Sequence, residues 1–133
     1  MIDVTMLATP KDWPSVLLPK KPGADPVDLD AAIAAGAFSA LRMAIRDLGP
    51  TGTIAAIGAS GLRGRGGAGY PAADKWRTAS STPAAERIVV ANGYGSDPST
   101  TSDHVLMERN PYAVIEGLAI AALAIGAGEA IIA

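Results

Sequence analysis

Cysteine is absent from this sequence, and histidine occurs only once, as His104. Without thiolates the chain can form no disulfide and can hold no zinc ion or iron–sulfur cluster through cysteine. A single imidazole is too little for a histidine-based metal site. The sequence also offers no Ser/His/Asp or Cys/His set for nucleophilic catalysis. We therefore expect no catalytic side chain and no metal site in this chain.

An excess of positive charge and a long apolar segment are also lacking. The formal net charge of −2 gives no electrostatic argument for nucleic-acid binding. The first residues lack a basic segment followed by an apolar one of signal-peptide length, which favours a cytoplasmic protein. The longest apolar run, 117–128, lies between Glu116 and Glu129 and is too short to span a membrane. We expect a buried helix there, with both glutamates exposed at element ends.

The hydrophobic pattern divides the chain into an arm and one domain. Residues 1–27 contain five prolines and little periodicity, which indicates an extended arm. The remainder, 28–133, is long enough for one α/β domain. Apolar residues follow Asp28 at helical spacing, with a break expected at Gly36 and an end at Gly49-Pro50.

The second half of the domain predicts parallel strands. Residues 88–91 are apolar, β-branched and bounded by turn residues, as in a buried strand. Helical segments at 102–109 and 111–125 follow, and the second is apolar on nearly every face. Residues 130–133 predict another strand. The fold class is therefore α/β, with N-terminal helices, a glycine-rich loop and Rossmann-like parallel strands joined by a buried crossover helix, in an incomplete domain.

Residues 51–64 permit two interpretations. If 53–57 form a strand, Gly58–Gly64 would be the first turn of a Rossmann-type NAD(P)-binding domain. If the segment is a helix, Ile54 and Ile57 face inward and Gly61 ends it in the left-handed conformation. A Rossmann turn requires an uninterrupted helix immediately afterwards, but further glycines and a proline follow. The helix is favoured, and the Rossmann-type domain remains the alternative.

The segment 61–76 has the most unusual composition in the chain. Five glycines fall within nine residues, which suggests backbone torsions or a close approach that a Cβ would forbid. Such a loop at the start of a helix can bind an anion through its N–H groups. Arg63, Arg65 and Lys75 add positive charge. The pattern predicts a site for a phosphate-bearing cofactor. The polar loop after residues 88–91 lies where ligands collect in open α/β sheets.

The run from Ser60 to Pro71, with Lys75-Trp76, resembles the hallmark of one flavoprotein family. This family is the 51 kDa flavoprotein subunit of NADH:quinone oxidoreductase (complex I), with related subunits in NAD-linked hydrogenases and formate dehydrogenases. The segments 35–41 and 110–127 also resemble it. The similarity covers residues 29–133, as in a truncated N-terminal FMN/NADH-binding domain.

The resemblance implies an oxidoreductase function. Hydride would pass from NADH to FMN, and electrons would continue to iron–sulfur clusters in the missing portion or in partner chains, such as the iron–sulfur subunits of a redox complex. The protein would be cytoplasmic, or peripheral to a membrane complex. Another possibility is a non-catalytic truncated paralogue or assembly subunit that has lost the cofactor.

The resemblance also assigns residues to the cofactor. In the family the glycine loop wraps the FMN phosphate and ribityl chain, an aromatic residue borders the nucleotide pocket, and an asparagine lies beside the flavin. The cofactor-binding residues implied here are Gly64, Arg65, Gly66, Gly67, Ala68, Gly69, Tyr70, Lys75, Asn92 and Asp97. An acidic cluster of the family is reduced here to Asp97, because Tyr94 and Gly95 replace two of its acids.

Overall fold

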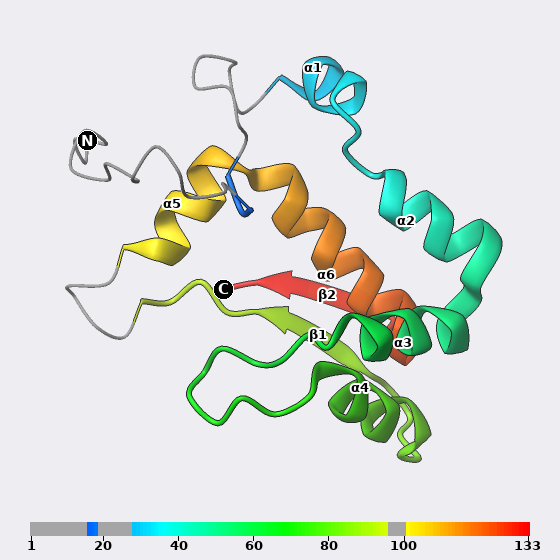
Figure 1. The fold of residues 1–133 in the computed structure, drawn as a ribbon. Helices are drawn as coiled ribbons and strands as arrows, with labels where there is room; N and C mark the ends of the chain where they lie inside the picture. The colour runs from blue at the N-terminus through cyan, green and yellow to red at the C-terminus, as the bar shows by residue number, and fades with distance from the viewer. Residues whose placement is uncertain (1–15, 19–27, 96–100) are drawn as a thin grey trace.

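The computed structural model describes residues 16–18, 28–95 and 101–133. Most of the proposed arm, 1–27, and the site candidate Asp97 therefore lie outside the described residues. Helices cover a small sheet of parallel strands (Figure 1). The elements in chain order are α1 (Leu29–Ala34), α2 (Ser39–Met43), the π-helical segment η2 (Ala44–Leu48), α3 (Gly49–Ser60), α4 (Ala72–Ser81), β1 (Ile88–Ala91), α5 (Ser102–Arg109), α6 (Pro111–Ile125) and β2 (Glu129–Ile132).

The N-terminal helices are interrupted at glycines. The Asp28 side chain accepts a hydrogen bond from the Ala31 N–H and caps α1. The predicted break at Gly36 is confirmed, because this residue adopts a φ of +106° between α1 and α2. The helix end predicted at Gly49-Pro50 is confirmed, because the helical segment η2 ends at Leu48 and Gly49 has a φ of +63°. Helix α3 begins there, since a proline in the first turn has no N–H to lose.

Helix α3 resolves the ambiguity at residues 51–64. It runs to Ser60 and ends at Gly61, which has a left-handed φ of +69°. Ile54 faces the interior, at 7% exposure. The alternative strand at 53–57 is wrong, and with it the Rossmann turn at Gly58–Gly64, because a helix precedes the glycine-rich loop.

The two strands pair in parallel, as predicted. The register runs from Ile88 opposite Glu129 to Ala91 opposite Ile132. Helix α6 contacts both strands and lies across them in Figure 1. Ile88 and Val90 are nevertheless exposed, so the expectation that residues 88–91 form a buried strand is wrong.

A small core joins the helices on both sides of the glycine-rich loop. Ile54 of α3, Ala73 of α4 and Ala124 of α6 form its buried centre. Ile57 and Trp76 pack against these three residues. Because α3 precedes the loop and α4 follows it, both ends of the loop are attached to the same packed unit.

Glu116 of α6 caps another helix far away in sequence. Its carboxylate accepts hydrogen bonds of 3.0 Å from the N–H groups of both Phe38 and Leu41, at the start of α2. Phe38 has a left-handed φ of +61°, and its ring meets Tyr112 edge-on at 6.0 Å. The expectation that Glu116 is an exposed helix end is wrong, since this side chain is half-buried.

Replacing Glu116 by glutamine should destabilise the chain by about 1–2 kcal/mol, because a neutral amide has one carbonyl oxygen for two N–H donors. Urea denaturation followed by circular dichroism measures the loss. The exposed Glu108 of α5 provides the control, and its change to glutamine should cost less than about 0.5 kcal/mol. Equal stability of the two variants would contradict the capping role.

Among the helices that the structure describes, none combines the length and the apolar character needed to cross a membrane.

Candidate functional site

The glycine-rich segment forms a closed loop between α3 and α4. Two backbone hydrogen bonds join its ends: the Gly64 N–H donates to the Tyr70 carbonyl at 2.8 Å, and the Ala72 N–H donates to the Leu62 carbonyl at 2.9 Å. Arg63 and Pro71 are paired between these bonds as an antiparallel bridge. The loop extends towards the side to which both strands point (Figure 1). Its base is therefore a short hairpin held by the two helices.

The body of the loop is rich in free amide donors. From Arg65 to Tyr70, the backbone N–H groups donate to no residue within the described ranges. Gly67 has a φ of +112° and Gly69 a φ of +60°, which L side chains rarely adopt. A Cβ built at either of these glycines meets no atom within 4 Å. Consecutive free amides in a glycine-rich loop are the backbone feature on which anion-binding nests are built.

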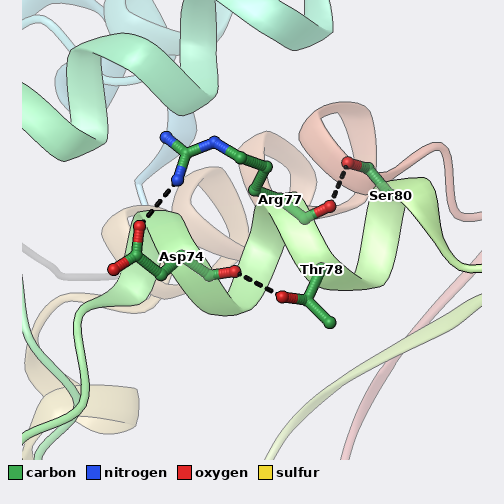
Figure 2. Close-up of polar contacts among 4 residues, drawn as sticks. All are labelled: Asp74, Arg77, Thr78 and Ser80. Carbon is green, nitrogen blue, oxygen red and sulfur yellow. Dashed lines mark hydrogen bonds and ion pairs between the residues drawn. The ribbon is translucent and has the colours of Figure 1, made fainter.

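Positive groups accompany these amides. Arg65 and Lys75 are exposed, and neither side chain forms an ion pair with any described residue. The carboxylate of Asp74, beside Lys75 in sequence, pairs instead with Arg77 at 2.6 Å on the same helix. Figure 2 shows this pair beside the Thr78 and Ser80 hydroxyls, which donate to backbone carbonyls of α4. No described carboxylate therefore compensates the charge of Lys75, which lies one turn into a helix whose N-terminus also favours anions.

A shallow recess lies at the carboxyl ends of the two strands. The Asn92 Oδ1 accepts a hydrogen bond of 2.9 Å from the Tyr94 N–H, which holds the backbone in a turn directly after β1. The Gly93 N–H donates to the Ala133 carbonyl and continues the pairing beyond the strands. The recess has about 420 Å³ of empty volume, its open mouth included. Its lining is Ala91, Asn92, Gly93, Asp103, Leu106, Met107, Val114 and Ile132.

The structure thus gathers most of the predicted site residues into two groups. Gly64 to Tyr70 form the loop, with Lys75 on the helix that follows it. Asn92 lies in the recess beyond β1, at the end of the sheet towards which the loop extends (Figure 1). Tyr70 is 55% exposed and free to border a ligand. Asp97 belongs to neither group, because it falls outside the described residues.

Two arginines have roles that the sequence did not reveal. The Arg63 Nη1 donates to the Gly69 carbonyl at 2.9 Å, so this side chain bridges the loop. Arg87 donates to the carbonyls of Ala79, Ser80 and Thr82 at the end of α4. The carbonyl of Arg87 in turn accepts from the Gly128 N–H, just before β2. The two side chains donate to carbonyls five to eight residues away in sequence. These sequence separations match neither the helical nor the strand period, so the pattern of the sequence does not reveal them.

Fold and site together define an α/β domain with an exposed glycine-rich loop between two helices. The chain belongs to the Nuo51 FMN-binding domain family, whose model matches residues 57–133. The family resemblance of the glycine-rich segment is thereby confirmed, and so is the α/β fold class.

Relatives occur in two kinds of redox complex. An NADH-quinone oxidoreductase subunit of Rhizobium meliloti, designated F 2, is 39% identical over 97 residues, which are 73% of this chain and 23% of that relative. The corresponding subunit of Aquifex aeolicus NADH-quinone oxidoreductase is 39% identical over 104 residues, 78% of this chain and 24% of the relative. The NAD-reducing hydrogenase HoxS subunit alpha of Cupriavidus necator is 40% identical over 85 residues, 64% of this chain and 14% of the relative. The chain thus spans about a quarter or less of the length of these relatives.

The crystal structure of an NAD⁺-reducing [NiFe]-hydrogenase in the air-oxidized state contains a similar fold. It superposes with a TM-score of 0.66 at 33% sequence identity. The similarity covers 96% of this chain and 22% of the hydrogenase chain. The fold is therefore shared with part of that hydrogenase chain, and the helix before the glycine-rich loop of this chain excludes a Rossmann unit.

Proposed function

We propose that this chain binds FMN and that the loop amides from Arg65 to Tyr70 hold its phosphate. One observation carries the proposal: consecutive backbone donors have no partner within the described part of the protein, in a loop whose glycines leave open space around them. Amide and cationic donors suit a phosphate dianion, and the family match supports FMN as its carrier. The residues present therefore fit the cofactor.

The remaining site residues receive separate roles in this proposal. Arg65 and Lys75 supply positive charge to the phosphate. The Asn92 Oδ1 is engaged by the Tyr94 N–H, so its Nδ2 group is the one available to a flavin ring beside the recess. Tyr70 borders the nucleotide, and Asp97 stays a site candidate by family resemblance alone.

In relatives of this kind the bound flavin would supply the redox chemistry, accepting a hydride from NADH and releasing single electrons to iron–sulfur clusters in other protein. This chain's residues would bind the phosphate, orient the ring and exclude competing ligands. Iron–sulfur subunits of a redox complex are the proposed partners, in the cytoplasm or at the periphery of a membrane complex. The names of the relatives, subunits of NADH-quinone oxidoreductases and of an NAD-reducing hydrogenase, support this assignment.

Flavin titration of the 133-residue chain tests the proposal. FMN should bind at least about tenfold more tightly than riboflavin, since only FMN carries the phosphate. Changing Lys75 to methionine should reduce FMN affinity about tenfold and leave riboflavin affinity unchanged. Quenching of flavin fluorescence measures both constants.

The control variant is Arg46→Met, which removes one exposed cation of η2. This variant should keep the affinity of the wild type for FMN. Equal affinities of the wild type for FMN and riboflavin would contradict a phosphate site. Under anaerobic conditions NADH should bleach the absorbance of the bound flavin if the chain has the proposed function. A paralogue without redox activity would leave this absorbance unchanged.

A further inference from the structure

We infer that Arg63 is a positioning residue for the glycine-rich loop, an inference that rests on the proposed function. Its guanidinium donates to the Gly69 carbonyl at 2.9 Å, one residue further into the loop than the bond between the Gly64 N–H and the Tyr70 carbonyl. The side chain thereby links the first strand of the hairpin base to the last glycine of the loop.

The consequence of this bond follows from peptide geometry. The described chain has no cis peptide, so the carbonyl of Gly69 and the N–H of Tyr70 point in opposite directions within one plane. When the Arg63 guanidinium holds the Gly69 carbonyl, the Tyr70 N–H must point away from the guanidinium. Gly69, at a φ of +60°, has no Cβ to restrict rotation of this plane. The guanidinium supplies the restraint that the glycine lacks.

Arg65 provides a natural comparison. It lies two residues further along, is also exposed and carries the same charge, but its side chain bonds to no described residue. If charge alone mattered, loss of either arginine would have the same effect on anion binding. If Arg63 positions the loop, the loss of FMN preference in an Arg63 variant and that in an Arg65 variant should respond differently to salt. The planar guanidinium is suited to this task because it presents its donors in a rigid fork, which an ammonium group lacks.

The test compares Arg63→Met, Arg63→Lys and Arg65→Met by titration with FMN and riboflavin at low and high salt. Arg63→Met should lower the preference for FMN over riboflavin about tenfold at both salt concentrations. The loss in Arg65→Met should shrink at high salt, because exposed charges are screened. Arg63→Lys should recover little of the preference, although it keeps the charge.

Two results would overturn the positioning role alone. In one, Arg63→Lys has the preference of the wild type. In the other, the loss in Arg63→Met disappears at high salt as it does in Arg65→Met. A wild-type chain that does not prefer FMN would contradict the proposed function itself. Arg63→Gln, neutral and polar, repeats the comparison should the methionine variant fail to fold.

Discussion

Replacing Gly67 by valine should weaken FMN binding by about 100-fold, because a φ near +112° costs an L residue about 1–3 kcal/mol and a β-branched side chain adds to this strain. The added Cβ meets no atom of the protein, so the effect arises from backbone torsion rather than from a clash. The loop would relax to another conformation, and its amides would no longer have their present orientations. Flavin fluorescence titration measures the loss.

A matched pair of alanine variants separates torsion from bulk. Gly66 and Gly67 are neighbours, and a Cβ at either meets open space, but only Gly67 has a positive φ. Gly67→Ala should therefore bind FMN more weakly than Gly66→Ala. Thermal unfolding of both should stay close to that of the wild type, since the loop is exposed. Wild-type affinity in Gly67→Val would remove the loop from the proposed site.

The largest expected effect on stability concerns Arg87. Changing it to methionine should lower the free energy of unfolding by about 2–3 kcal/mol, because three carbonyls at the end of α4 lose a charged donor at once. Methionine keeps much of the length and apolar stem of arginine, so packing changes little. Urea denaturation measures the difference.

Arg42→Met is the control for Arg87. The guanidinium of Arg42 is exposed and makes a single long hydrogen bond, of 3.5 Å, to the Ala37 carbonyl. Its removal should cost less than about 0.5 kcal/mol. Arg87→Lys should recover part of the stability, since an ammonium group donates from one atom only. If Arg87→Met and Arg42→Met unfold at the same urea concentration, water solvates the three carbonyls at the end of α4 adequately without the guanidinium.

Local patterns were sufficient to predict most elements of this fold. The break at Gly36, the left-handed end of α3 at Gly61 and the strand at 88–91 each depend on residues within a few positions of one another. The glycine-rich loop was also recognisable, because its composition is unusual in any context. These features follow from torsional preference and periodicity, which a sequence displays directly.

Contacts between distant segments were not predictable in the same way. Glu116 caps a helix that begins more than seventy residues earlier, and a lone glutamate carries no mark of that partner. The exposure of Ile88 and Val90 depends on which face of the sheet α6 covers. Asn92 is a common turn residue, and only the structure shows it lining a recess. Tertiary placement decides each of these cases.

The shared packing of α3, α4 and α6 has a thermodynamic consequence for ligand capture. Ile54 and Ala73 lie on opposite sides of the loop in sequence and meet Ala124 in one cluster. The conformational freedom of the loop's ends is therefore lost when the chain folds rather than when an anion arrives. Preorganisation of this kind lowers the entropic cost of association. Loosening this cluster would accordingly reduce affinity for an anion without altering any atom of the proposed phosphate site.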